Sequence, residues 1–217
     1  MAPARAFAGF PAWGVSFYES LELNNTKEYW AEHKAQWEQQ VRDPMRALMA
    51  ELEPEFGPAK VFRPNRDIRF SPDKSPYKTY QGAIAGPSAG VGYYVQLDGE
   101  GLTLGGGFHA HSPAQTDRYR AAVDAARSGE ALEQITKTLA AQGYSLEGDA
   151  LKTRPKGFDA DHPRLDLLRR KEMMAIRRVG EPAWLATPDA LDEVRDAWTQ
   201  IRSLNEWIVE HVGAADS

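Results

Sequence analysis

The sequence predicts an α+β fold, in which an antiparallel β-sheet packs against several helices as a single domain. Apolar residues recur every three or four positions in the segments before residue 57 and after residue 187, which indicates amphipathic helices. In much of the chain between them, apolar and polar residues alternate over short runs, as they do in half-buried strands. The resulting order of helices, strands, helices, one strand and a last helix is typical of an antiparallel sheet packed on helices.

Capping residues define the first helices. Asn25 with Glu28 forms a capping-box pattern, so a helix is expected to begin there. Asp43 before Pro44 is typical of a new helix start, and Gly57 is typical of a helix end. The three helices expected in this part of the chain cover residues 16–23, 26–41 and 44–56.

The remaining elements follow from alternation and from turn residues. Strands are expected over 62–70, 77–85, 91–97, from 102, and over 171–178. Helices are expected over 113–127 and 129–142, with a turn of helix near 164–168 and a long helix from about 189 to 212. Three consecutive glycines, residues 105–107, mark a place where another backbone can approach closely.

Length and composition describe an ordinary globular protein. The 217 residues fit one large domain, expected over 16–212 with an N-terminal extension over 1–15 and a tail over 213–217. The formal net charge of -5 argues against bulk nucleic acid as the main partner, because such binding depends on neutralising phosphates. The absence of cysteine excludes disulfides, thiolate metal sites and cysteine nucleophiles. No apolar run is long enough for a membrane span and the first residues lack a signal-peptide pattern, so the cytoplasm is the expected location.

One stretch, residues 63–80, is more cationic than the rest of this acidic chain. Its five cations are Arg63, Arg66, Arg69, Lys74 and Lys78. The stretch contains only two acidic residues, Asp67 and Asp73. Its three prolines favour extended or turn geometry. Arginine forks on a strand suit phosphate and carboxylate groups, so the stretch is a candidate anion-binding site on the two arms of a hairpin. The alternative is a structural network in which the two acids hold the arginines.

Two further groups of residues are candidates for binding. Lys152, Arg154 and Lys156 form a second cationic loop that is expected to close on the anion. His109 and His111 lie two residues apart, so an extended backbone would turn both to one side, where they could share a metal. Spacing places no third ligand beside them, and surface or capping histidines are the alternative.

Several short motifs together resemble one protein family. They are Asn24-Asn25 leading to Tyr29-Trp30, the block from Arg66 to Ser71 continuing through Asp73 to Thr79, Gly105-Gly106-Gly107, and Pro155-Lys156-Gly157-Phe158-Asp159. In this order they resemble the uncharacterised family known as domain of unknown function 2461, over roughly residues 17–212. The resemblance implies one whole domain, and it implies no activity, cofactor or catalytic residue.

The residues support two functional hypotheses. In the first, the protein is a cytoplasmic enzyme or ligand-binding protein for a phosphorylated or other anionic small molecule. Arg66 and Arg69 would clamp the anion with help from Lys74 and Lys78, and Asp67 would orient an arginine or act as a base.

In the second hypothesis, the protein is a binding module without chemistry that grips a nucleic-acid backbone or an acidic protein segment. Four tyrosines would then offer stacking surfaces: Tyr77, Tyr80, Tyr93 and Tyr94. The sequence assigns no reaction and no cofactor under either hypothesis.

Overall fold

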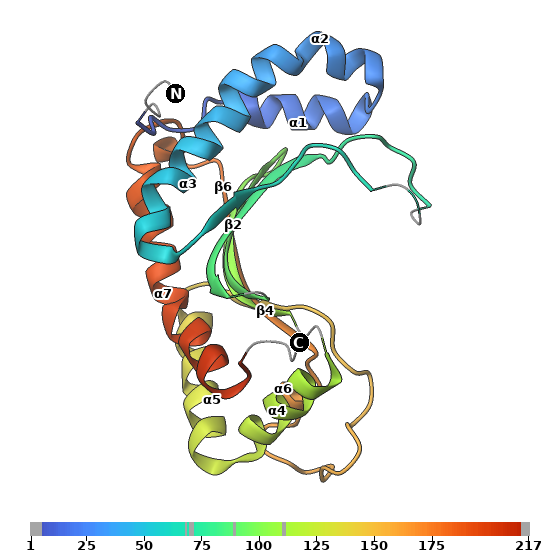
Figure 1. Ribbon diagram of the computed structural model, residues 1–217, viewed down its shortest axis with the longest axis vertical. Helices are drawn as coiled ribbons and strands as arrows, with labels where there is room; N and C mark the ends of the chain where they lie inside the picture. Colours follow the sequence, from blue (N-terminus) through green and yellow to red (C-terminus); the bar gives the residue numbers. More distant parts are fainter. Residues whose placement is uncertain (1–5, 68, 70–71, 89, 110–111, 214–217) are drawn as a thin grey trace. The chain divides into compact units, whose positions relative to one another are not determined.

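The computed structural model describes residues 6–67, 69, 72–88, 90–109 and 112–213 (Figure 1). Along the chain the elements are α1 (Trp13–Leu23), α2 (Lys27–Trp37), the π-helical turn η1 (Glu38–Arg42), α3 (Asp43–Phe56), β1 (Ala59–Val61), β2 (Tyr80–Ser88), β3 (Val91–Asp98), β4 (Gly101–His109), α4 (Pro113–Asp124), α5 (Ala126–Ala141), β5 (Ser145–Glu147), α6 (Leu165–Leu168), β6 (Glu172–Gly180), the 3-10 turn η2 (Ala183–Ala186) and α7 (Ala190–His211).

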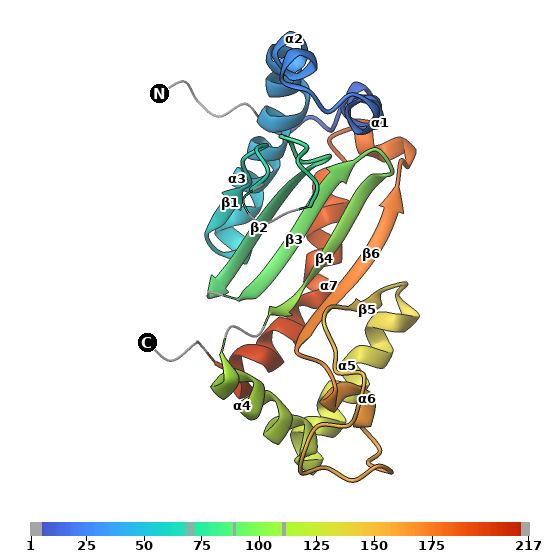
Figure 2. The ribbon, with the colours of Figure 1, turned by 90° about the vertical axis from the view of Figure 1, so that its right-hand side faces the viewer.

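The six strands form one antiparallel sheet, which confirms the predicted α+β class. Their order is β1-β2-β3-β4-β6-β5, and Figure 2 shows them side by side in this order. Alternate residues of β3 are buried, as the sequence pattern predicts for a sheet with one face on the core. No helix in the described residues is long and apolar enough to cross a membrane.

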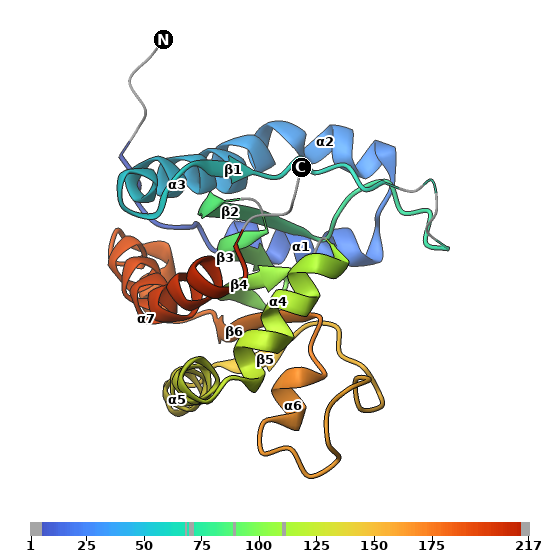
Figure 3. The ribbon, with the colours of Figure 1, turned by 60° about the horizontal axis from the view of Figure 1, so that its bottom comes forward.

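The chain divides into two compact units, and several elements contribute residues to both. The first unit comprises residues 1–85, 94–104 and 178–196, and the second comprises 86–93, 105–177 and 197–217. In the second unit α7 packs on the sheet: Trp198 stacks on Tyr93 at 5.4 Å, and Asn205 donates from Nδ2 to the Gly92 carbonyl at 3.1 Å. Helices α4, α5 and α6 belong to this unit as well (Figure 3).

The glycine run lies in β4, where the neighbouring strands β3 and β6 approach closely in the second unit. A Cβ atom at Gly106 would lie 2.7 Å from the Gly92 carbonyl oxygen, and one at Gly107 would lie 2.0 Å from that of Met173. Gly107 also has φ of 145°, which side-chain-bearing residues rarely adopt. The close backbone approach predicted from the sequence is therefore present.

The helical part of the first unit differs from the expectation at Pro44. Instead of ending before a new helix, the chain continues as one helix from Lys27 to Phe56 through the π-helical turn η1. Proline has no N–H and its ring would clash with the carbonyl four residues earlier, that of Gln40. The N–H of Asp43 reaches back to the Glu38 carbonyl, five residues earlier, so a wider turn accommodates the proline without a break.

The cap of this long helix also differs from the expectation. Thr26 is the N-cap, and its hydroxyl accepts from the Tyr29 N–H at 3.1 Å. Asn25 is used elsewhere: its Nδ2 donates to the Tyr77 carbonyl at 2.9 Å, and its Oδ1 accepts from the Tyr77 N–H at 3.2 Å. A side chain predicted to cap a helix thus fixes a segment 52 residues later.

Residues 62–70, expected as a strand, form only a sparse ladder with their partner, which includes a bond from the Phe62 N–H to the Gly82 carbonyl at 2.9 Å. Asn65 forms an antiparallel bridge with Tyr77, flanked by bonds from Arg66 N–H to Pro76 and from Lys78 N–H to Pro64. The predicted hairpin is present in this form, and prolines at three positions explain its poor ladder because they donate no N–H. The described strand of this region is β1, which pairs with β2 through Ala59↔Ala85, Lys60↔Ile84 and Val61↔Ala83.

Candidate functional site

A basic groove lies in the first unit between the long helix and the hairpin. Its volume is about 600 Å³. One wall is the helix formed by α2, η1 and α3, and the other is the extended segment 61–65 with Tyr77. Five cationic side chains line the groove, namely Lys27, Lys34, Arg42, Arg46 and Arg63, together with one carboxylate, Glu38.

Two contacts fix the hairpin wall against the helix. Asn25 forms its two hydrogen bonds with the backbone of Tyr77, and the Tyr77 ring stacks on Trp30 with centroids 4.2 Å apart and planes 13° apart. Trp37, further along the helix, is buried, and its Nε1 donates to the Tyr18 hydroxyl at 3.0 Å. The stack of Tyr77 on Trp30 therefore determines how far apart the two walls of the groove lie.

The groove carries excess positive charge in a protein that is negative overall. Glu38 accepts from Arg42 at 2.6 Å, and Arg42 also lies 3.2 Å from Asp43. Among the described residues, no carboxylate lies within 4.0 Å of the other four cations: Lys27, Lys34, Arg46 and Arg63. Like charges held together without a counter-ion raise the local potential and favour an anion.

Lys78 extends this positive region beside Arg63. Its pKa is lowered, first by burial and then by the charges of Arg63 and Lys60. Its Nζ lies over the Phe62 ring at 5.1 Å, which holds the ammonium in place by a cation–π interaction. The hairpin register sets Lys78 opposite Pro64, and its N–H donates to the Pro64 carbonyl at 2.8 Å.

Two of the predicted clamp arginines form ion pairs with the local acids. Arg66 pairs with Asp73, and Arg69 forms two bonds with Asp67, at 2.6 Å and 2.9 Å. The Arg69 guanidinium lowers the pKa of Asp67, which makes this carboxylate a weaker base. Of the two roles considered for Asp67, the geometry shows the contact with an arginine. In this part of the hairpin the structural network is present.

The other predicted residues lie outside the groove. Lys74 is exposed on the hairpin. Lys152, Arg154 and Lys156 are exposed in the second unit, where Arg154 donates to the Phe158 carbonyl at 2.5 Å. His111 lies outside the described residues, as does the side chain of His109. In the part of the chain that the structure describes, no three His, Asp or Glu side chains are grouped to hold a metal ion.

The tyrosines considered as stacking surfaces have partners. Tyr93 is 6% exposed beneath Trp198, and Tyr77 is stacked on Trp30. The Tyr94 hydroxyl donates to Gln96, and burial raises its pKa. Tyr93 is therefore too deeply buried to receive a base from solution without disruption of the core.

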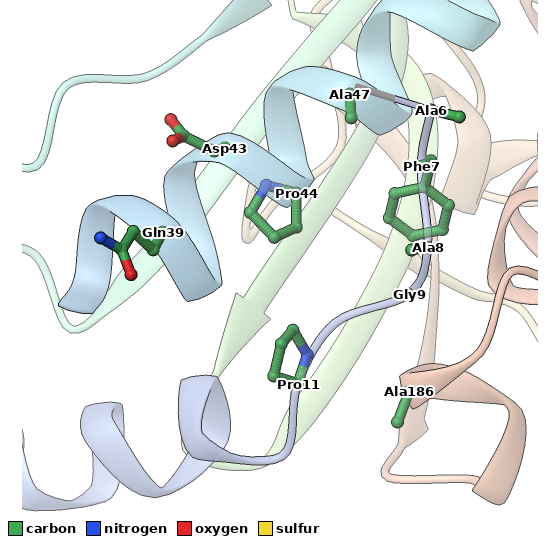
Figure 4. Close-up of a pocket in the computed structure, with 10 residues that line it drawn as sticks. All are labelled: Ala6, Phe7, Ala8, Gly9, Pro11, Gln39, Asp43, Pro44, Ala47 and Ala186. Carbon is green, nitrogen blue, oxygen red and sulfur yellow. The ribbon is translucent and has the colours of Figure 1, made fainter. Parts of the chain in front are cut away.

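A smaller hollow of about 340 Å³ lies on another side of the long helix (Figure 4). Its lining residues are Ala6, Phe7, Ala8, Gly9, Pro11, Gln39, Asp43, Pro44, Ala47 and Ala186. Asp43 is the charged residue among them, so the hollow does not suit an anion.

Sequence reasoning missed the four cations of the helical wall. Lys27, Lys34, Arg42 and Arg46 recur on one face of the helix, on the same side as Trp30. Their spacing of four, seven or eight residues was a usable signal, because such positions share a helical face. The sequence does not specify that the hairpin lies opposite this face, since that depends on the contacts between Asn25 and Tyr77.

Comparison with known proteins returned one family. The model of the family described as "Conserved hypothetical protein (DUF2461)" matches residues 14–207. No curated protein and no solved structure matches the chain.

Proposed function

The chain belongs to the DUF2461 family, and from the groove geometry we propose that it is a cytoplasmic protein that binds a phosphorylated or other anionic small ligand between the long helix and the hairpin. The observation that carries this proposal is the set of four groove cations, Lys27, Lys34, Arg46 and Arg63, that lack a carboxylate partner among the described residues. Exposed lysines and arginines are normally interspersed with acids in a protein of net charge -5.

The proposal assigns binding and no reaction. Glu38 is the sole carboxylate among the described residues that line the groove, and Arg42 holds it at 2.6 Å. The described part of the groove therefore offers one carboxylate, and an arginine already occupies it.

The alternative is a non-catalytic module for nucleic acid or an acidic protein segment. Such modules combine a basic groove with ring faces on which bases stack. In this groove Trp30 and Tyr77 stack on each other, and Trp37 is 2% exposed. The small-anion reading is therefore the better supported one.

A thermal-shift panel of inorganic phosphate, sugar phosphates, nucleotides and dicarboxylates tests the proposal. A ligand at one hundred times its dissociation constant should raise the unfolding midpoint by about 5 to 10 °C in a protein of this size. Arg63→Ala should weaken binding of that ligand by about tenfold, because it removes a charge-assisted bond.

Arg69→Ala is the matched control. Arg69 belongs to the same hairpin, but it is bound to Asp67 and does not line the groove. It should leave the affinity nearly unchanged. An equal loss in both variants, or no shift with any anion at low salt, would refute the proposed site.

A further inference from the structure

The cations on the helical wall of the groove form a row. Lys27, Lys34, Arg42 and Arg46 line the groove from α2, η1 and α3, which are parts of one continuous helix. At a rise of about 1.5 Å per residue, the row extends for roughly 28 Å from Lys27 to Arg46. One phosphate group can engage only a short part of such a row, and a ligand with several anionic groups can engage more of it.

The opposite wall adds positive charge near the same ligand path. Arg63 lines the groove from the hairpin, and Lys78 lies near it: the pKa of Lys78 is lowered first by burial and then by the charges of Arg63 and Lys60. The acid on the helical wall, Glu38, lies within the row and neutralises only Arg42. The groove therefore has cations on two sides and along its length.

The rings of the groove do not offer a stacking platform. Trp30 stacks on Tyr77, Trp37 is buried, and Phe62 has the Lys78 ammonium over its face. A nucleobase would have to displace one of these partners. Phosphate groups, in contrast, need only the exposed cations.

From the row and the occupied rings we infer that the ligand is an oligophosphate, with several phosphate groups linked in a line and held by charge without base stacking. This inference rests on the proposed function, which requires only that the groove bind an anion. It adds that several cations act together, so that affinity rises with the number of linked phosphates.

The test compares inorganic phosphate, tripolyphosphate and a polyphosphate long enough to follow the row, titrated calorimetrically into the full chain at low salt. Tripolyphosphate should bind at least about tenfold more tightly than phosphate, because linked groups bind with a high effective concentration. The long chain should bind more tightly still. Oligothymidylate of equal charge should bind more weakly than the long polyphosphate.

Variants at the two ends of the row show whether the row is used. Lys27→Gln and Arg46→Gln should each weaken the long polyphosphate by about two- to fivefold, as expected for exposed charge pairs. Both side chains are exposed, so the fold should persist, and circular dichroism checks this. Lys137→Gln is the control, since Lys137 belongs to the second unit and pairs with Glu133 at 2.8 Å.

The outcomes separate the two proposals. Equal affinity for phosphate and polyphosphate would overturn the oligophosphate inference and leave the proposed anion site standing. Unchanged polyphosphate affinity in both end variants, or tighter binding of oligothymidylate, would overturn it as well. Failure of every anion to bind would refute the proposed function itself.

Discussion

Asn25 acts as a substitute for a strand at the point where the hairpin meets the helix. Its amide group exchanges two hydrogen bonds with the backbone of Tyr77, at 2.9 Å and 3.2 Å, as a neighbouring strand would. The stack of Tyr77 on Trp30 follows from this placement. One side chain therefore sets the position of a whole groove wall.

Replacement of Asn25 by alanine should destabilise the protein by about 1 to 3 kcal/mol, because two part-buried backbone groups lose their partner. Asn24→Ala is the matched control: Asn24 is exposed and donates only to the Ser20 carbonyl at 3.2 Å, so the loss should stay within about 0.5 kcal/mol. Urea unfolding measures both. Equal losses would show that Asn25 has no special role.

The carboxylate of Asp67 should show a pKa below its unfolded value of about 3.9, because Arg69 stabilises its charged form. A carboxyl group with a lowered pKa contributes stability that is complete above the unfolded value and is lost as the pH falls through the folded value. The hairpin contact should therefore weaken only below about pH 4.

An NMR pH titration of the aspartate carboxyl groups checks this. Arg69→Ala should raise the pKa of Asp67 toward about 3.9. Arg66→Ala should change the pKa of Asp73 less, because the bonds from Ser75 are the larger cause there. A pKa of Asp67 that Arg69→Ala leaves unchanged would contradict the pairing.

At the scale of elements, features that depend on neighbouring residues, such as helix caps, could be predicted from the sequence. Features that depend on contacts between distant residues could not. The helix expected over 113–127 is present as α4, and Ser112 caps it: its hydroxyl accepts from the Gln115 N–H at 3.2 Å. Such a cap can be predicted because it depends on neighbours in sequence. Sequence reasoning missed that the helix continues through Pro44. The hydrogen bonds of a π-helical turn reach back one residue further than those of an α-helical turn, and the packing of the whole helix decides which turn forms. The hairpin register likewise depends on Asn25, remote in sequence.

The glycines of β4 provide a sharp element-scale prediction. Gly107→Ala should destabilise the protein by more than about 3 kcal/mol, because the new Cβ would lie 2.0 Å from the Met173 carbonyl oxygen and φ is positive. Gly157→Ala is the control: φ is 94°, but no atom lies within 4 Å of the new Cβ. Thermal unfolding compares them, and similar midpoints would contradict the close approach.

At the scale of the whole molecule, the sequence predicted an anion site from eight cations, and the described side chains of these residues do not all line the groove. Arg63 lines the groove as expected, while Arg66 and Arg69 are paired with acids that lie seven and two residues away. The sequence shows which charged residues lie near one another along the chain. Which arginine pairs with which carboxylate depends on how the hairpin folds back. The helical cations became part of the site only through tertiary packing.

The two candidate cationic groups can be compared at equal net charge. One variant replaces three groove cations by glutamine, at Lys34, Arg46 and Arg63, and the other replaces the three loop cations, at Lys152, Arg154 and Lys156. Each lowers the formal charge by three from -5, so any effect of overall charge on an anion is the same in both.

The groove variant should lose the anion-induced rise in the unfolding midpoint, while its ligand-free midpoint stays the same or rises, because repulsion between the groove cations is relieved. The loop variant should keep the anion response. Differential scanning calorimetry with and without the ligand measures both. A response lost only in the loop variant would place the site in the second unit, and an equal loss in both would show that net charge and not the groove attracts the anion.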